Sequence, residues 1–166
     1  MLHYREAVLS DLGWIVEVYN STVPGKMVTA DTEPVTIESR RDWFEAHHTG
    51  DRPLWIVENE PGELVGWVSL QSFYGRPAYR ATAEVSIYLE ERYRGCGYGR
   101  MILQHCLEEA PEIGVKTLLG FIFAHNVPSL QLFKSLGFEE WGILPRVASW
   151  GDEEKDLKIL GKRLVI

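Results

Sequence analysis

Arg94-Gly95-Cys96-Gly97-Tyr98-Gly99-Arg100 decides how the rest of this chain folds, because it joins a strand pattern to a helix pattern through a turn rich in glycine. Glycines let the backbone turn tightly and approach a ligand without interference from side chains. The helix that follows presents unpaired N–H groups and the positive end of its dipole to that ligand. The stretch therefore predicts a site for an anion such as a phosphate or a pyrophosphate.

The segments on either side of the turn are typical of a strand, a helix and a second strand. Apolar and polar side chains alternate in residues 81–89: Ala83, Val85, Ile87 and Leu89 point one way, and Glu84, Ser86 and Tyr88 point the other. One face of this strand therefore belongs to the core, and the other faces a cleft. An amphipathic helix follows the turn, and residues 117–123 are apolar enough for a strand buried on both faces. We expect a right-handed β-α-β unit with the glycine turn at the carboxyl end of its first strand.

The rest of the chain predicts further strands and helices around that unit. We expect a strand at residues 2–5, a helix from Ser10-Asp11, a long loop at 21–34, and a helix from Thr36 that includes Trp43 and Phe44. Residues 54–58 and 64–72 predict a hairpin, residues 126–136 a helix closed by Gly137, and residues 138–160 the last strands. This order predicts an α/β (α+β) fold in one domain, residues 1–166. Its central sheet is mixed and mostly antiparallel, with helices on both faces.

The composition narrows the class of protein. A hydrophobic fraction of 45% and a charged fraction of 25% over 166 residues are typical of a globular domain. A net charge of −7 without clustered Lys and Arg argues against a nucleic-acid partner. No apolar run approaches the ~20 residues of a membrane span, and no signal sequence is recognised, so we expect a cytoplasmic protein that does not bind membranes. Cys96 and Cys106 are too few for a disulfide framework, and the histidines indicate no metal site.

Spacing separates three possible ligands of the glycine turn. A P-loop needs a Lys followed by Ser or Thr after its last glycine, and the stretch has neither. A dinucleotide-binding turn that began at Gly97 would need its third glycine at residue 102, which is Ile102. The pattern that fits is R-x-x-G-x-G, with Arg94, Gly97 and Gly99 in the fixed positions.

That pattern resembles the acetyl-CoA-binding motif of the GNAT acetyltransferases. A second block, Asn126-Val127-Pro128-Ser129-Leu130-Gln131-Leu132-Phe133-Lys134-Ser135-Leu136-Gly137-Phe138, is similar to the family's N-x-x-S-x-x-L-(aromatic)-x-x-x-G-F segment. Residues 82–89 resemble the T-V-E-x-S-V-Y-V strand of the phosphinothricin and methionine sulfoximine N-acetyltransferases, and the match extends from Tyr4 nearly to Leu164. The resemblance implies the GNAT fold, acetyl-CoA as cosubstrate, and a homodimer. It also implies an N-acetyltransferase whose acceptor is a small amino acid analogue such as phosphinothricin, methionine sulfoximine or methionine sulfone.

The same resemblance implies which residues form the site. The positions expected to hold acetyl-CoA are Ile87, Tyr88, Leu89, Arg94, Gly95, Cys96, Gly97, Tyr98, Gly99, Arg100, Asn126 and Ser129. An amine must lose a proton before it attacks a thioester, and Glu84 is the expected general base, with a pKa raised by burial. The alternative is a buried ion pair of Glu84 with Arg76, Arg80 or another arginine. The N–H of Tyr88 or Leu89 would stabilise the oxyanion, and Asn126 is equally expected as a helix N-cap.

The loop at residues 73–80 is the expected acceptor pocket, because it combines aromatic side chains with two arginines. Arg76 or Arg80 would hold an α-carboxylate through two parallel hydrogen bonds while the amine points at Glu84. A solvated surface arginine is the alternative at each position. With the strand that follows, the expected acceptor-binding residues are Phe73, Tyr74, Gly75, Arg76, Arg80, Glu84, Val85 and Ser86.

Two departures from the family pattern keep other functions open. Many GNAT enzymes have a tyrosine, thought to protonate the departing thiolate, where this chain has Phe133. A water, Tyr88 or Tyr98 would have to replace it, or CoA would leave as a thiolate. Residues 150–157 also differ from the corresponding segment of the herbicide-resistance members. The alternatives are acetylation of a polyamine, an aminoglycoside or a protein N-terminus, and a non-catalytic acyl-CoA-binding module.

Overall fold

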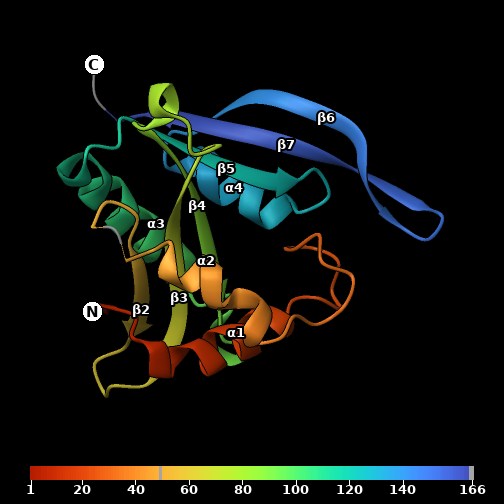
Figure 1. The fold of residues 1–166 in the computed structure, drawn as a ribbon. Helices are drawn as coiled ribbons and strands as arrows, with labels where there is room; N and C mark the ends of the chain where they lie inside the picture. Colours follow the sequence, from red (N-terminus) through yellow and green to blue (C-terminus); the bar gives the residue numbers. More distant parts are fainter. Residues whose placement is uncertain (49, 165–166) are drawn as a thin grey trace.

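The computed structural model describes residues 1–48 and 50–164, and its strands form a seven-stranded sheet in the order β1-β2-β3-β4-β5-β7-β6 (Figure 1). The strands are β1 (His3–Glu6), β2 (Leu54–Glu58), β3 (Leu64–Ser72), β4 (Thr82–Leu89), β5 (Thr117–Phe123), β6 (Glu139–Trp150) and β7 (Glu153–Arg163). Neighbouring strands pair antiparallel except β4 and β5, which are parallel. The predicted mixed, mostly antiparallel sheet is confirmed.

Helices cover both faces of the sheet. They are α1 (Leu12–Asn20), α2 (Arg41–Glu45), α3 (Tyr98–Glu109) and α4 (Val127–Ser135), with 3₁₀ turns at Leu9–Asp11, Glu38–Arg40, Pro77–Tyr79, Glu91–Tyr93 and Ala110–Ile113. The buried side chains of α1 and α2 pack with Ile56 of β2, whereas those of α3 and α4 pack with its neighbour Val57. Consecutive strand residues point to opposite faces, so the two cores lie on opposite sides of the sheet.

The chain differs from the sequence prediction in two places near its N-terminus. The first strand begins at His3 rather than Leu2. The segment expected to form one helix from Thr36 forms the 3₁₀ turn Glu38–Arg40 followed by the short α2. Thr36 and Ser39 cap the start of this segment through two reciprocal hydrogen bonds. The Ser39 N–H donates to Thr36 Oγ1 at 3.1 Å, and the Thr36 N–H donates to Ser39 Oγ at 3.2 Å. This turn fixes where the chain enters α2.

The parallel pair β4 and β5 is hydrogen-bonded over only part of its length. Its register joins Thr82–Glu84 to Thr117–Leu119, although β4 continues to Leu89 and β5 to Phe123. The loop at residues 21–34 is tied to the end of β5, because Asn126 Nδ2 donates to the Met27 carbonyl at 3.1 Å. Figure 1 shows this loop, in red to orange, below the ends of β5 and α4. The separated strand ends therefore open next to the loop.

Across the ranges given above, no helix is both long enough and apolar enough to span a membrane.

Candidate active site

A cavity of about 240 Å³ lies between the separated ends of β4 and β5. The residues expected to hold acetyl-CoA that line it are Ile87, Tyr88, Leu89, Arg94, Gly99, Asn126 and Ser129. The others, Gly95, Cys96, Gly97, Tyr98 and Arg100, belong to the adjacent glycine turn and the start of α3 and are not in its wall. Because β5 does not pair with β4 beyond Glu84, the β4 edge from Val85 to Leu89 presents backbone groups to this cavity. An extended ligand can pair with such an edge as an added strand does.

The glycine turn has the backbone conformation that a compact anion site needs. Gly95 and Gly97 have φ angles of +74° and +84°, in the left-handed region that side chains disfavour. Gly97 is the N-cap of α3, and among the described residues no side chain caps this helix. The first N–H groups of α3 are therefore available to a phosphate at the positive end of the helix dipole.

Hydrogen bonds of Arg94, Arg100 and Asn126 hold together the segments around this cavity. Arg94 donates from Nε to the Leu89 carbonyl at 3.2 Å and from Nη2 to Ser21 Oγ at 2.9 Å. Arg100 Nη1 donates to Ser135 Oγ at 2.6 Å and so joins α3 to α4. Asn126 accepts from the Ser129 N–H at 3.4 Å and therefore is the N-cap of α4, as one of its two expected roles required.

A second cavity, of about 180 Å³, lies on the α1 and α2 side of the sheet. Its floor consists of three cross-strand pairs of β3 and β4: Gln71 with Glu84, Ser69 with Ser86, and Trp67 with Tyr88. Its walls come from α1 and from the segment that leads into α2, through Ile15, Val16, Tyr19, Val35, Arg40 and Trp43. The polar face of β4 therefore lines a cavity, as its alternating pattern predicted.

Glu84 has no hydrogen-bond or ion-pair partner within the described part of the chain. Burial raises the pKa of its carboxyl group to about 7, because the surrounding protein disfavours the charged form. The expected alternative, an ion pair with Arg76, Arg80 or another arginine, is not formed among the described residues. Arg80 lies 3.8 Å from Asp51 with 82% of its side chain exposed, and Arg76 is also exposed. Near pH 7 the Glu84 carboxyl group can therefore both accept and release a proton.

The two cavities share part of their walls. Ser86 and Tyr88 line both, and Tyr88 also lines a third cavity of about 410 Å³ that includes Glu84 and Trp150. The Tyr88 ring stacks on Trp67 with 4.5 Å between centroids, and burial raises the pKa of its phenol, which stays protonated. A ligand in the cavity between β4 and β5 and a ligand in the cavity beside Glu84 would therefore both contact Tyr88.

We call the cavity of about 180 Å³ on the α1 and α2 side of the sheet the Glu84 cavity. The structure does not bring the loop at residues 73–80 into its wall. Its aromatic side chains contact one another instead, with centroid distances of 4.5 Å between Phe73 and Tyr74 and 5.4 Å between Phe73 and Tyr79. The buried Arg52 holds the end of the loop by donating from Nη2 to the Arg80 carbonyl at 2.6 Å. Val85, another expected acceptor residue, is buried on the opposite face of β4 and lines the cavity between β4 and β5.

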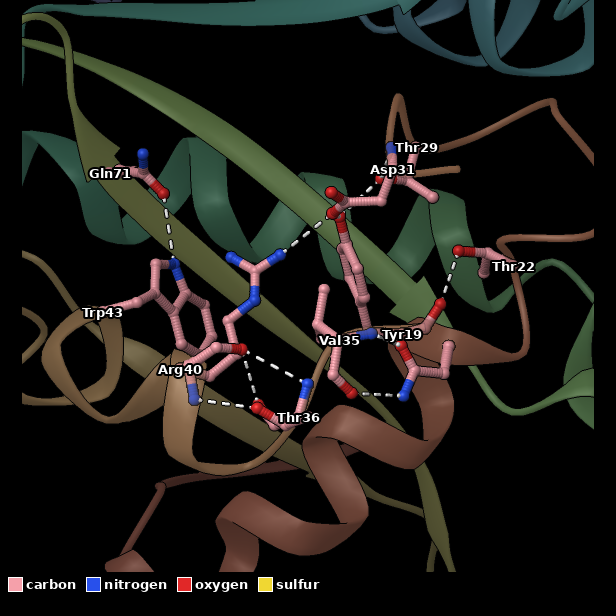
Figure 2. A network of polar contacts seen from close by, with 11 residues as sticks. Tyr19, Thr22, Thr29, Asp31, Val35, Thr36, Arg40, Trp43 and Gln71 are labelled. Atoms are coloured by element: carbon pink, nitrogen blue, oxygen red, sulfur yellow. Dashed lines mark hydrogen bonds and ion pairs between the residues drawn. The ribbon is translucent and has the colours of Figure 1, made fainter. Parts of the chain in front are cut away.

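The cation in the wall of the Glu84 cavity is Arg40, which the sequence analysis did not select. Figure 2 shows its side chain between Tyr19 and Trp43, directed towards Asp31. Arg40 and Trp43 are three residues apart, a spacing that places them on one face of a helical turn. That spacing, within the helix expected from Thr36, is the signal that could have identified Arg40.

Comparison with known proteins gives a consistent result. Residues 15–138 match the acetyltransferase (GNAT) family. The chain is 53% identical to YwnH of Bacillus subtilis, named as a candidate phosphinothricin acetyltransferase, over 96% of this chain and 98% of that protein. It is 31% identical to the L-methionine sulfoximine/L-methionine sulfone acetyltransferase of Pseudomonas paraeruginosa, over 86% of this chain and 83% of that protein.

A solved structure of the same kind supports the assignment. A phosphinothricin acetyltransferase from Sinorhizobium meliloti in complex with acetyl-CoA superposes with a TM-score of 0.90 and 25% identity, over 98% of this chain and 88% of that one. The predicted GNAT fold is therefore confirmed. The chain belongs to the GNAT family of acetyltransferases and is an acetyltransferase enzyme.

Proposed function

We propose that this enzyme transfers the acetyl group of acetyl-CoA to the α-amine of a small amino acid analogue such as phosphinothricin, methionine sulfoximine or methionine sulfone. Acetyl-CoA is the cosubstrate, and the donor site is the cavity between β4 and β5 together with the glycine turn. The names of the relatives in Bacillus and Pseudomonas support the acceptor class. The observation that carries the proposal is that Glu84 lies in a cavity whose wall, at Ser86 and Tyr88, is shared with the donor cavity.

Glu84 is the general base of the proposed reaction. Its carboxylate takes a proton from the acceptor's ammonium group, which leaves an amine with a free electron pair. The amine attacks the thioester carbonyl, and the N–H of Tyr88 or Leu89 on the unpaired β4 edge donates to the oxyanion that forms. When the C–S bond breaks, the nitrogen gives up a second proton and the sulfur gains one. This transfer balances the reaction without a tyrosine at Phe133.

The enzyme is proposed to act as a homodimer of single-domain chains. Strand β6 is an edge of the sheet, and it exposes Trp141, Ile143, Leu144 and Val147. Large apolar side chains grouped on one exposed strand are typical of a surface that another protein covers. A second copy of this chain is the partner that the proposal names.

A thiol-release assay with acetyl-CoA tests the proposed function. The amines to compare are phosphinothricin, methionine sulfoximine, methionine sulfone, ordinary amino acids, a polyamine, an aminoglycoside and a peptide. The proposal requires thiol release with the amino acid analogues at the highest kcat/KM. Faster acetylation of the polyamine, the aminoglycoside or the peptide would contradict the acceptor class. Acetyl-CoA binding with no turnover on any amine would leave a non-catalytic binding module instead.

A further inference from the structure

Arg40 is held in a fixed position in the wall of the Glu84 cavity. Its guanidinium carbon lies 4.7 Å from the centroid of the Tyr19 ring and 6.0 Å from that of Trp43 (Figure 2). A guanidinium over aromatic faces gains cation–π attraction and loses little conformational freedom when it binds a ligand. Only 27% of the side chain is exposed. Arg40 is therefore ordered before an acceptor arrives.

Asp31 fixes the direction of this guanidinium. Arg40 Nη2 donates to Asp31 Oδ2 at 3.1 Å, and the same oxygen accepts from the Tyr19 hydroxyl. Tyr19 belongs to α1 and Asp31 to the loop at 21–34, so three segments distant in sequence meet at one ion pair, as Figure 2 shows. Asp31 does not itself line the Glu84 cavity, so its charge does not take the place of a ligand there.

Arg40 has hydrogen-bond donors to spare. A guanidinium carries five N–H donors, and within residues 1–48 and 50–164 the one acceptor bonded to Arg40 is Asp31. Among the described residues that line the cavity, Arg40 and Glu84 are the charged ones. The cavity therefore offers a cation with free donors and, in the same space, a group that accepts a proton. A molecule with a carboxylate and a neighbouring amine matches both.

We propose that Arg40 binds the α-carboxylate of the acceptor and so restricts the enzyme to α-amino acids. This inference rests on the proposed function, and it replaces the loop arginines Arg76 and Arg80 with a residue that lines the cavity. Trp43 and Trp67 supply apolar surface for the acceptor side chain. The Gln71 amide oxygen accepts from Trp43 Nε1 at 3.3 Å, so the NH₂ group is the part of this amide that would donate to a sulfone or phosphinate oxygen.

The test compares two acceptors that differ only in the carboxylate: methionine sulfone and 3-(methylsulfonyl)propylamine. The wild-type enzyme should prefer the amino acid in kcat/KM. Arg40→Gln should raise the KM for methionine sulfone by about 10- to 100-fold, the loss expected when charge-assisted hydrogen bonds are removed. The same variant should leave the kinetics of the amine and the KM for acetyl-CoA nearly unchanged. The preference for the amino acid would then disappear.

Matched variants separate binding from folding. Arg41→Gln alters the next residue, an exposed arginine that pairs with Glu38 at 3.2 Å outside the cavity, and should keep the wild-type preference. Arg40→Lys retains the charge but not the two parallel donors, so it should lower the preference about tenfold. If Arg40→Gln does not fold, the acceptor preference of Arg40→Lys tests the role of Arg40 in its place.

The outcomes distinguish the two proposals. Wild-type enzyme that releases thiol with neither acceptor nor any other amino acid would contradict the proposed function. Wild-type enzyme that prefers the amino acid, together with Arg40 variants that keep this preference, would overturn the role of Arg40 alone. Loss of the preference in Arg76→Gln or Arg80→Gln, but not in Arg40→Gln, would place the carboxylate at the loop and overturn it too.

Discussion

Protonation of Glu84 should set the lower limit of the pH range in which the enzyme works. Its pKa is raised to about 7, so the base is mostly protonated below that pH and mostly ionised above it. We expect kcat/KM for the acceptor to fall as pH decreases through about 7. Glu84→Gln should lower kcat by ~100-fold or more and remove this dependence. Initial rates between pH 5.5 and 9 provide the measurement, with Glu108→Gln on the exposed side of α3 as control.

The same carboxyl group should make stability depend on pH. Its pKa in the folded protein lies above the unfolded value, so its contribution is fully present at low pH and is lost as pH rises from about 4.5 to about 7. Glu84→Gln lacks the charge. It should therefore raise the free energy of unfolding relative to wild type by on the order of 3 kcal/mol at pH 8 and by little at pH 4. Urea unfolding at the two pH values measures the difference, and an equal effect at both would refute a buried, unpaired carboxylate.

At the scale of elements, the sequence predicted the strands whose bounds depend on residues close to one another in the chain. Strands β2, β3 and β5 have the bounds that their patterns predicted, because alternation and turn residues act within a few positions. The face of β4 that lines a cavity was predicted for the same reason. The position of the 73–80 loop was not predicted, because it depends on Arg52, a residue more than twenty positions earlier that donates to the Arg80 carbonyl. Arg40 was missed because the loop, α1 and α2 form its surroundings only after folding.

The glycine turn before α3 provides an element-scale prediction. Gly97→Ala should destabilise the protein by about 1 kcal/mol, because its φ of +84° suits only glycine, and should raise the KM for acetyl-CoA about tenfold. Gly62→Ala is the matched control, since Gly62 has a φ of +90° in the β2–β3 turn with nothing within 4 Å of an added Cβ. Thermal unfolding should show similar losses in both variants. Only Gly97→Ala should change acetyl-CoA kinetics, and a similar KM change in Gly62→Ala would show that strain alone is responsible.

At the scale of the whole molecule, β6 is the surface that we expect to join two copies. Sedimentation should give twice the 19.0 kDa mass of one chain. Ile143 is 50% exposed on β6, so Ile143→Glu should shift the protein towards monomer without loss of secondary structure. Glu154→Gln, an exposed change on the adjacent β7, is the control. Wild-type protein that sediments as a monomer at every concentration would exclude this interface.

The two sets of side chains of β4 and its backbone edge face different parts of the molecule. Ala83 and Val85 are buried in the core, Glu84, Ser86 and Tyr88 line the Glu84 cavity, and the unpaired backbone edge borders the cavity between β4 and β5, which Ser86 and Tyr88 also line. The proposed binding of acetyl-CoA through this backbone edge places few demands on side-chain identity. Substitutions at Ser69 and Gln71, which line the Glu84 cavity but not the cavity between β4 and β5, should therefore change the acceptor preference with little change in acetyl-CoA use. Enzymes with new amine preferences can arise from this scaffold, by natural drift or by design, through changes on one face of a single strand pair.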